Sequence, residues 1–331
     1  MSISRRGLFS SFKAMLAGGS AGLVSRQTLA FAQSSPARPY VNPRRVFLGE
    51  TTRKEFREAL QSGRIKAAII PTGSTEQHNE HLTLDCDATC STLIAQQAAL
   101  RLYPQIIVST PCPLGYAPYH MARPGTLTLR KETFKAYVFD VIQSLATHGI
   151  RTILVVNGHN GNHAPLLEMM PEWRKQLGIT LDSETYITAF KDDELAGFLT
   201  SYRLLREGKL DTIGRRTGMS HASEVETSIL MAAHPERVRP FTMEEYDQAK
   251  LNYESGYSPQ VAAYLEPFTK QGWPKGENPE NARDRARQEQ ALFATKEKGE
   301  RLITIATQFI AGKLQRMIAA TEKGTPWPVR G

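Results

Sequence analysis

The chain has 331 residues, of which 40% are hydrophobic and 22% are charged, a composition typical of a soluble globular protein and a length compatible with one α/β domain. Its formal net charge of +8 falls to +4 when residues 1–32, which hold four basic residues and no acid, are set aside. That modest charge, without a basic stripe interleaved with aromatic residues, predicts no nucleic-acid partner. No apolar stretch approaches the length of a membrane span, so we expect no membrane contact in the mature form.

The first residues have the pattern of an export signal. Arg5 and Arg6 precede a mildly apolar stretch rich in Ala and Gly, and Ala30-Phe31-Ala32 is a small-x-small cleavage pattern. This resembles a twin-arginine signal peptide over residues 1–32, which implies the twin-arginine export machinery as a partner and a periplasmic or exported protein. An amphipathic first helix is the alternative, but the Gly18-Gly19 break and the missing acids argue against it.

Strand-like and helix-like patterns alternate through the rest of the chain. Residues 33–46 contain three prolines and predict an extended tether, which is followed by a single domain over 47–331. The expected strands are the apolar runs Lys66–Pro71, Gln105–Thr110, Thr152–Val156 and Thr185–Phe190. The expected helices are Phe47–Gly63, Ala88–Leu102, Glu132–Thr147 and Pro165–Leu177. This alternation predicts an α/β fold, with a mostly parallel sheet covered by helices on both faces.

The C-terminal region predicts a long, charged helical segment. It starts at Asn278-Pro279-Glu280, where Asn is a cap and Pro takes the first helical position, and we expect a break or bend at Gly299. Beyond it, an apolar stripe at helical spacing is expected to pack on the sheet. The stripe consists of Leu302, Ala306, Phe309, Ile310, Leu314 and Met317.

Three cysteines are too few for a disulfide framework, and their number is odd. Cys86 and Cys90 lie close enough in sequence to pair, but their four-residue spacing does not guarantee a suitable geometry. We expect buried free thiols, and the absence of a CxxC motif makes a thiolate zinc site improbable.

The loop Gly73–Asp87 concentrates more potential metal-binding side chains than other segments of the sequence. It directly follows the first apolar strand and carries carboxylates and imidazoles at Glu76, His78, His81, Asp85 and Asp87. A divalent metal ion makes such crowding favourable near a buried strand, because it neutralises the carboxylates and accepts imidazole ligands. A polar loop with incidental histidines is the alternative.

Two further motifs supply partners for this loop. The strand Thr152–Val156 runs into NGHNGNH, where glycines flank His159 and present its ring from the carboxyl end of the strand. The Lys-Ser/Thr ending of a phosphate-binding loop is absent. The segment HASEVETS places His221, Glu224 and Glu226 at the start of an apolar helix, which could also be an ordinary helix start with acids near the positive end of the dipole.

Taken together, the motifs GSTEQHxxHLTLxxD, VVNGHNGNH and HASEVETS, with Gly115–Leu129 between them and Ala294–Gly299 after them, resemble the creatininase (creatinine amidohydrolase) family. The resemblance covers nearly all of the chain after the tether. It implies a three-layer αβα fold and a hydrolytic site with two divalent ions. One ion would be held by Glu76, His159 and Asp87, and the other by His78, Asp87 and a glutamate, with Asp87 bridging and a water activated between the ions.

The chain departs from creatininase in two places. Creatininase can use a glutamate two residues after the strand-end histidine, where this chain has Gly161, so Glu226 is the expected fifth ligand and Glu224 the alternative. Creatininase also closes its pocket with tryptophans near the catalytic histidine, and this chain has none there. The expected substrate is therefore a small, compact amide with a non-peptide C–N bond, not necessarily creatinine.

Other residues receive roles from their position in the motifs. His221 is the predicted proton shuttle, and His81, Asp85 and Glu224 are expected to orient the ligands. Tyr116, Tyr119, His120 and Arg123 are expected to line the pocket, Arg123 as a partner for a substrate carboxylate.

The ligand set suits zinc, manganese or iron. The resemblance also implies a homo-oligomer, with a hexamer as the plausible form. Three alternatives to the amidohydrolase remain open: a creatininase-like peptidase, a hydrolase of a cyclic ketone or lactone, and a periplasmic metal-binding or ligand-binding protein without catalysis.

Overall fold

The computed structural model describes residues 45–121, 123–209, 221–250, 258–269 and 280–328, which belong to one compact unit. The predicted signal peptide and nearly all of the predicted tether lie outside the described residues. Within the described part of the chain, no helix has both the length and the apolar character that a membrane span requires.

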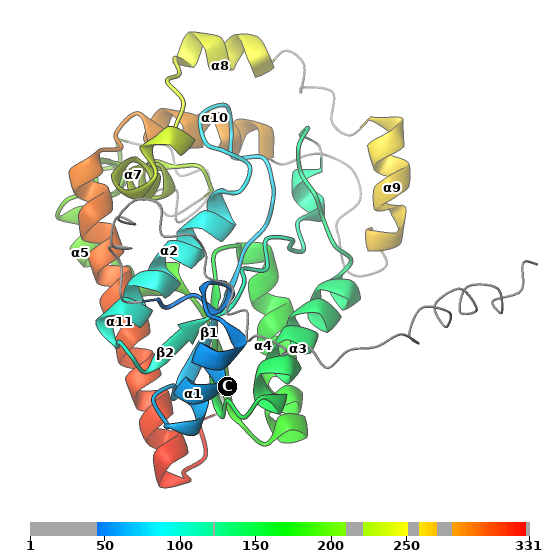
Figure 1. The fold of residues 1–331 in the computed structure, drawn as a ribbon. Coiled ribbons are helices and arrows are strands. Elements are labelled where there is room, and N and C mark those ends of the chain that lie inside the picture. Colours follow the sequence, from blue (N-terminus) through cyan, green and yellow to red (C-terminus); the bar gives the residue numbers. More distant parts are fainter. Residues whose placement is uncertain (1–44, 122, 210–220, 251–257, 270–279, 329–331) are drawn as a thin grey trace, which may run out of the picture. The chain divides into compact units, whose positions relative to one another are not determined.

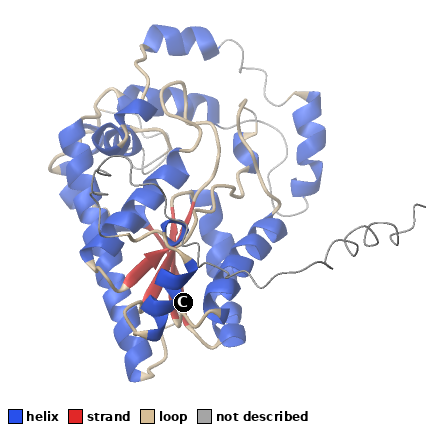
Figure 2. Ribbon diagram, in the orientation of Figure 1, coloured by secondary structure: helices blue, strands red, loops and turns tan. Residues whose placement is uncertain are grey.

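A parallel sheet forms the centre of the fold, with helices around it (Figure 2). It has four strands in the order β2-β1-β3-β4. The strands are β1 (Ala67–Thr72), β2 (Ile106–Val108), β3 (Thr152–Asn157) and β4 (Thr180–Thr185). In the middle of the sheet, β1 pairs with β3 so that Ile69 lies opposite Leu154. Both strands are buried along their full length, as continuous apolar runs predict for a sheet covered on two faces.

Alternate residues of β1 enter two separate hydrophobic cores. Ala67 and Ile69 belong to one core, whereas Ala68 and Ile70 belong to the other, because successive side chains of a strand point to opposite faces. The helices that cover the sheet are α2 (Cys86–Arg101), α3 (Lys131–Thr147), α4 (Asn160–Leu177) and α11 (Lys296–Lys323). Residues of α2 and α11 fill the first core and those of α3 and α4 fill the second (Figure 1). The predicted three-layer α/β fold with a mostly parallel sheet is therefore confirmed.

Shorter elements complete the described residues. The α-helices are α1 (Arg53–Gln61), α5 (Asp192–Ala196), α6 (Thr200–Arg206), α7 (Glu224–Ala233), α8 (Met243–Lys250), α9 (Pro259–Thr269) and α10 (Glu280–Ala291). The 3-10 helices are η1 (Leu48–Glu50), η2 (Pro118–His120), η3 (Tyr186–Ala189) and η5 (Pro235–Arg237). The expected first helix thus consists of η1 and α1, and Thr52 caps α1 by accepting the backbone N–H of Glu55.

The fourth strand lies earlier in the chain than its apolar pattern predicts. The run Thr185–Phe190 predicts a strand, but η3 occupies most of it and β4 covers the polar segment TLDSET before it. That strand buries Asp182 and Glu184. Lys313 of α11, only 1% exposed, lies 2.7 Å from Asp182 Oδ2 and 2.8 Å from Glu184 Oε2. Lys313 and Arg174, whose Nη2 lies 3.1 Å from Asp182 Oδ1, together balance the two acids, and no local pattern reveals the distant lysine.

The C-terminal prediction is wrong at Gly299 and right for the stripe. The helical segment is interrupted between α10 and α11, before Gly299, and the glycine lies inside the continuous helix α11. A Cβ on Gly299 would lie 1.9 Å from the Ser228 carbonyl oxygen of α7. Glycine is therefore required for the close approach of two helices, not for a bend. The residues of the predicted stripe that are fully buried in the core are Leu302, Ala306, Ile310, Leu314 and Met317.

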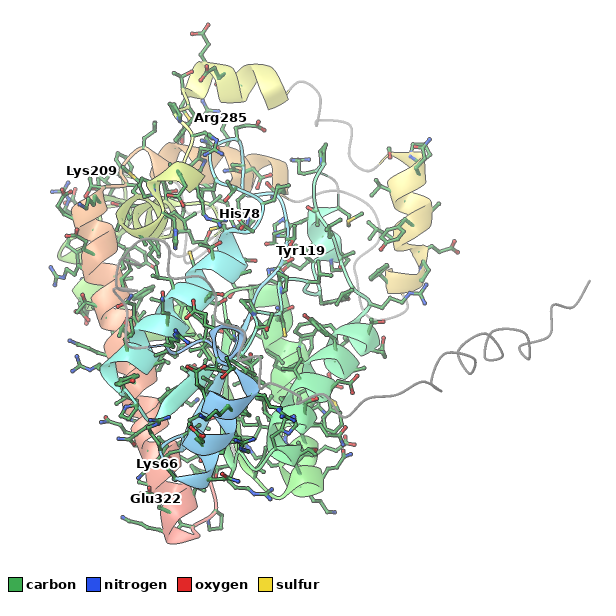
Figure 3. All side chains as sticks on the ribbon, viewed as in Figure 1. Lys66, His78, Tyr119, Lys209, Arg285 and Glu322 are labelled. Atoms are coloured by element: carbon green, nitrogen blue, oxygen red, sulfur yellow. The ribbon has the colours of Figure 1, made fainter. Side chains whose placement is uncertain are left out.

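The two ends of the sheet carry different kinds of residues. Figure 3 shows His78 and Tyr119 toward one end of the molecule, and Lys66 and Glu322 toward the other. Lys66, just before β1, pairs with Glu322 near the end of α11. The loops that follow β1 and β3 begin at the opposite end, where parallel α/β sheets usually hold their sites.

Candidate metal centre

The five predicted metal ligands meet in one buried cluster. Glu76 and His78 lie in the loop after β1, Asp87 in the first turn of α2, His159 directly after β3, and Glu226 in the first turn of α7. None of them is more than 4% exposed. Three stretches that are distant in sequence, at 76–87, 159 and 226, thus bring carboxylates and imidazoles together away from water.

Asn157, the last residue of β3, holds the backbone that carries His159. Its Oδ1 accepts the His159 N–H at 3.1 Å, and its Nδ2 donates to the His159 carbonyl at 2.6 Å. The same Oδ1 accepts the Thr72 hydroxyl at 3.2 Å. Because Thr72 ends β1, these bonds tie together the carboxyl ends of the two central strands.

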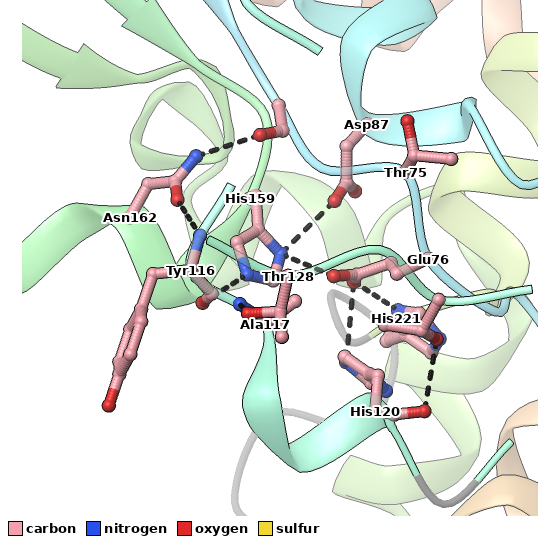
Figure 4. A network of polar contacts seen from close by, with 12 residues as sticks. Thr75, Glu76, Asp87, Tyr116, Ala117, His120, Thr128, His159, Asn162 and His221 are labelled. Carbon is pink, nitrogen blue, oxygen red and sulfur yellow. Dashed lines mark hydrogen bonds and ion pairs between the residues drawn. The ribbon is translucent and has the colours of Figure 1, made fainter. Parts of the chain in front are cut away.

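Glu76, Asp87 and His159 form the first candidate ion site (Figure 4). His159 Nδ1 lies 3.1 Å from Glu76 Oε2 and 3.1 Å from Asp87 Oδ2. The other ring nitrogen, Nε2, lies 3.0 Å from the Tyr116 carbonyl oxygen, which can only accept. A neutral ring that donates through Nε2 directs the lone pair of Nδ1 toward the two carboxylates, which is the arrangement of a metal-binding histidine.

The donor atoms of this first site fit a divalent metal ion. Glu76 Oε2 and Asp87 Oδ2 are buried and accept no hydrogen bond of normal geometry. Buried carboxylate oxygens of this kind are costly unless a cation compensates them. Together with the imidazole, they form the ligand set that zinc, manganese and iron accept.

His78, Asp87 and Glu226 form the second group. His78 Nε2 lies 3.2 Å from Asp87 Oδ1 and 3.7 Å from Glu226 Oε2, and its Nδ1 lies 3.1 Å from the backbone carbonyl of Glu76. Asp87 thus offers Oδ2 to the first group and Oδ1 to the second, as a bridging carboxylate does. The buried Cys86 thiol also belongs to a set of possible donors with His78 and Glu226, all within 4.8 Å of one another. Sequence reasoning did not point to this soft donor.

The pKa values show how strongly these charges act on one another. Burial alone would lower the pKa of His78, but Asp87, Glu226 and Glu76 outweigh it and raise that pKa to about 10. Glu76 and Asp87 likewise raise the pKa of His159, against the effect of its burial. Burial raises the pKa of Glu226 to about 7. In the absence of a metal, protons on the two imidazoles therefore balance the carboxylates.

Gly161 explains why the glutamate of the second group comes from α7. A Cβ on Gly161 would lie 2.3 Å from the Tyr116 carbonyl oxygen and 2.4 Å from His159 Nε2. No larger residue fits there while His159 keeps its position. Glu226 is instead held by Ala222, whose N–H donates to Glu226 Oε2 at 2.6 Å and whose φ of 52° is rare outside glycine.

His120 and His221 stack beside the cluster. Their ring centroids are 4.3 Å apart and their planes differ by 23°. His120 Nε2 and His221 Nδ1 lie 3.3 Å and 3.4 Å from Glu76 Oε1. The second nitrogen of each ring lies 3.0 Å from the side-chain nitrogen of Gln77. Burial holds the pKa of both rings well below its ordinary value, so both are neutral. Sequence reasoning missed Gln77, although it stands between two predicted ligands.

A cavity of about 170 Å³ opens beside the cluster. Its lining consists of Glu76, Asp87, Tyr119, His120, Gly158, His159, Asn160, His221, Glu226 and Arg287. Tyr119 and His120 therefore line this cavity, whereas Tyr116 and Arg123 are not among the lining residues. Tyr116 acts through its carbonyl, and Arg123 Nη2 lies 3.3 Å from Asp284 Oδ2. The cavity guanidinium comes from Arg287, which sequence reasoning missed and which also pairs with Asp284 at 3.1 Å.

Glu224 has a capping role, against the prediction that it orients or replaces a metal ligand. Its carboxylate accepts the backbone N–H groups of Thr200 and Ser201 at 3.0 Å and 2.8 Å and pairs with Lys298 at 2.5 Å. It thereby provides a hydrogen-bond acceptor for the backbone N–H groups at the start of α6. Residues two positions apart on a helix point in nearly opposite directions, so Glu224 and Glu226 serve different neighbours.

His81 and Asp85 also bond to residues other than the five ligands. His81 Nε2 lies 2.8 Å from Thr227 Oγ1, next to Glu226 in sequence, so His81 supports the turn of α7 that carries this ligand. Asp85 accepts the Thr83 hydroxyl at 2.7 Å and pairs with Arg237, which makes it a loop anchor. Both therefore contact side chains around the site, and these contacts do not reach the side chains of the five ligands. All three cysteines are free and buried, as expected.

Comparison with known proteins adds an independent result. The family model described as creatinine amidohydrolase matches residues 49–314. The chain is 27% identical over 201 residues to creatinine amidohydrolase of Pseudomonas putida, covering 58% of this chain and 74% of that protein. It is 29% identical over 198 residues to 3-dehydro-scyllo-inosose hydrolase of Thermotoga maritima, covering 59% of this chain and 58% of that protein.

Further matches extend the range of chemistry and the likeness in fold. Mycofactocin precursor peptide peptidase of Mycobacterium ulcerans is 26% identical over 177 residues, covering 51% of this chain and 59% of that protein. A solved structure of creatininase matches with a TM-score of 0.62 at 23% identity, covering 82% of this chain and 98% of that chain. Solved forms of creatininase at similar likeness include a manganese form and a zinc–zinc form. These relatives are hydrolases, and their substrates differ.

Proposed function

The chain belongs to the creatininase family, and from that premise we propose that it is a metal-dependent hydrolase of a C–N bond in a small, compact amide, cyclic amides included. The proposed cofactors are two divalent ions of zinc, manganese or iron. One is held by Glu76, Asp87 and His159, and the other by His78, Asp87 and Glu226. The manganese and zinc–zinc forms of creatininase support this choice of metals.

One observation carries the proposal. The two oxygens of Asp87 face two different imidazoles, at 3.1 Å and 3.2 Å, beside a cavity that could admit a substrate. Asp87 Oδ2 and Glu76 Oε2 accept no hydrogen bond there. Ions at these positions would activate a water and polarise the amide carbonyl next to the cavity.

The remaining cavity residues contact the substrate. His221 lines the cavity and stands 3.4 Å from Glu76 Oε1, so it is placed to act on the reacting amide. Arg287 offers a cationic contact for a polar or anionic group of the substrate. Tyr119 adds a hydroxyl on the side of His159, whose Nε2 lies 3.2 Å away.

The size of the cavity favours a compact substrate, not necessarily creatinine. A volume of about 170 Å³ is small beside the roughly 300–1,000 Å³ of pockets for drug-sized ligands. Trp173 packs in the core between α3 and α4, and Trp327 donates to Asp182 at 2.9 Å. Neither tryptophan lines the cavity, and Trp273 lies outside the described residues.

Peptide trimming is the second candidate, favoured by the peptidase relatives at 26% to 30% identity. It uses the same ligands and differs in the substrate that the cavity admits. A hydrolase of a cyclic ketone or lactone shares the site as well. A metal-binding protein without catalysis remains the candidate from another class.

We also propose that the protein is exported through the twin-arginine route and acts in the periplasm, as Arg5-Arg6 and Ala30-Phe31-Ala32 suggest. A homo-oligomer, with a hexamer as its form, is proposed on the resemblance alone. Fractionation of cells and the mass of the purified protein in solution test these two points separately.

The decisive experiment combines metal analysis with a substrate screen. The purified protein is loaded with zinc, manganese or iron, its metal content is measured, and it is assayed against cyclic ureas, lactams, lactones, short amides and short peptides. His221→Ala is expected to keep its metal and lose hydrolysis. Absence of stoichiometric metal under all loading conditions would refute the proposal, and bound metal without any hydrolysis would favour the binding protein.

A further inference from the structure

The Gln77 side chain joins the two neutral histidines of the cavity wall. Its Nε2 lies 3.0 Å from His120 Nδ1 and 3.0 Å from His221 Nε2. Its Oε1 accepts the backbone N–H of Asn79 at 3.0 Å, and its own backbone N–H donates to Thr126 Oγ1 at 3.1 Å. A backbone N–H can only donate, so the contact with Asn79 identifies the oxygen end of the amide. The NH2 end therefore faces both rings.

This orientation dictates the tautomer of each ring. An amide NH2 group has two hydrogens to donate and cannot accept, so each imidazole must present a lone pair to Gln77. His120 accepts through Nδ1 and is protonated at Nε2, whereas His221 accepts through Nε2 and is protonated at Nδ1. These protonated nitrogens are the ones that lie 3.3 Å and 3.4 Å from Glu76 Oε1.

We propose that Gln77 is a positioning residue that holds His120 and His221 with their N–H groups turned toward Glu76 and the cavity. The tautomers follow from the contacts alone, whereas their use in catalysis rests on the proposed function. Two N–H groups directed at Glu76 Oε1 leave the other carboxylate oxygen, Oε2, to face Asp87 and His159 in the first ion site.

The same tautomer defines what His221 contributes to the reaction. The lone pair of His221 is engaged by Gln77, and a neutral ring that gave up its only proton would become an anion, so His221 serves as a hydrogen-bond donor and keeps its proton. When water adds to the amide carbon and the C–N bond breaks, the proton that the water loses passes to the leaving nitrogen. The His221 Nδ1–H donates a hydrogen bond to the amide as negative charge develops on it, and the ring stays neutral throughout.

Nitrogen-15 NMR of the histidine rings tests the proposal without any substrate, because protonated and lone-pair ring nitrogens differ in chemical shift. The spectra are recorded on the metal-free and the zinc-loaded full chain. We expect Nε2–H for His120 and Nδ1–H for His221 in the unmodified protein. Gln77→Glu replaces the donor by an acceptor of the same shape, so each ring must turn a protonated nitrogen toward position 77. Gln77→Met removes the donor, so each ring becomes a mixture of tautomers.

The chain supplies a matched control in Gln288. Its Nε2 lies 3.1 Å from His81 Nδ1, and it is as deeply buried as the residues of the site. Gln288→Glu also places a new carboxylate against a buried imidazole, but away from the five ligands. We expect it to change the signals of His81 and to leave those of His120 and His221 unchanged.

Two results would overturn the proposal: the opposite tautomer of either ring in the unmodified protein, or unchanged tautomers in both Gln77 variants. Should Gln77→Glu fail to fold, Gln77→Met decides alone. Once a substrate is known, kcat of Gln77→Glu should fall by about 100-fold or more with little change in KM, since a hydrogen-bond donor to the reacting amide is misplaced. Loss of the proposed function would show instead as bound zinc, correct tautomers and no hydrolysis, so the two failures are distinguishable.

Discussion

Two buried clusters of charge lie in this molecule, and they are balanced in different ways. Beside β4, Asp182 and Glu184 face the ammonium group of Lys313 at 2.7 Å and 2.8 Å. In the candidate metal centre, Glu76 and Asp87 face imidazole rings that can also be neutral. The chain brings a permanent cation to the first cluster and only proton-dependent partners to the second.

The comparison separates a structural charge cluster from a metal centre. Burial alone does not distinguish them, since both are almost inaccessible to water. The discriminating feature is the partner, because an ammonium group satisfies a carboxylate permanently, whereas a neutral imidazole offers a lone pair that needs a cation. The imidazole partners of Glu76 and Asp87 mark the second case.

The largest expected effect comes from removing the shared carboxylate. Asp87→Asn keeps the shape but loses the charge and one acceptor oxygen, so we expect the content to fall from about two ions per chain to below one. Asp182→Asn is the same change in the other cluster. This variant should bind as much metal as the unmodified protein and should have a lower thermal stability. Full metal content in Asp87→Asn, measured by elemental analysis, would contradict the proposed bridging role.

Removing the Lys313 cation should lower stability and leave metal binding unchanged. Lys313→Met leaves Asp182 and Glu184 buried without their ammonium partner, so the free energy of unfolding should drop by about 3–5 kcal/mol. Metal content per folded chain should stay unchanged. Denaturant unfolding and metal analysis check the two parts, and a loss of metal at unchanged stability would show that the clusters are not independent.

The two glutamates of α7 provide a matched pair. Glu226→Gln should lose the second ion and keep the first. The Glu226 carboxylate lies 3.7 Å from His78 Nε2, and the substitution removes its charge. Glu224→Gln should retain both ions and lose about 1–3 kcal/mol of stability, because the N–H groups of Thr200 and Ser201 and the Lys298 charge lose their anionic acceptor. Selective loss of an ion in the Glu224 variant would reverse the assignment.

Metal binding should release protons. In the metal-free protein the pKa of His78 is about 10, so this ring is protonated at pH 7 and must lose its proton to bind an ion. We expect at least about one proton released per chain at pH 7, and an affinity that rises roughly tenfold per pH unit for each proton released. Calorimetric titration in two buffers of different ionisation enthalpy measures this number, and a value of zero would contradict the assignment of His78.

A smaller effect concerns acid stability. Burial alone would raise the pKa of Asp182, but Lys313 outweighs it and holds that pKa below the ordinary value of 3.8. A lowered native pKa contributes stability that is present above the unfolded value and is lost as pH falls through the native one. Unfolding free energies of the metal-free protein should therefore decline below about pH 4, and Lys313→Met should decline less steeply there.

Much of the fold and of the candidate site could be predicted from local sequence. The runs that form β1 and β3 are continuous and apolar, and each leads directly into histidines and acids, so both the sheet and its active end are visible in the chain. Predictions from local sequence failed where the position of a residue depends on a partner that is distant in the chain. β4 is polar because Lys313 lies against it, and Glu224 points to Lys298 and not to an ion.

The amino-acid sequence by itself determined the layered α/β fold, the family and the inventory of acids and imidazoles, because these depend on periodicity and on motifs of adjacent residues. Only the tertiary structure decided the direction of each side chain. It set the tautomers of His120 and His221 through Gln77, placed Arg287 in the cavity instead of Arg123, and gave Glu226 the position next to His78. The physical reason is that hydrogen bonds and charge pairs depend on distances of a few ångströms between segments that are far apart in the chain.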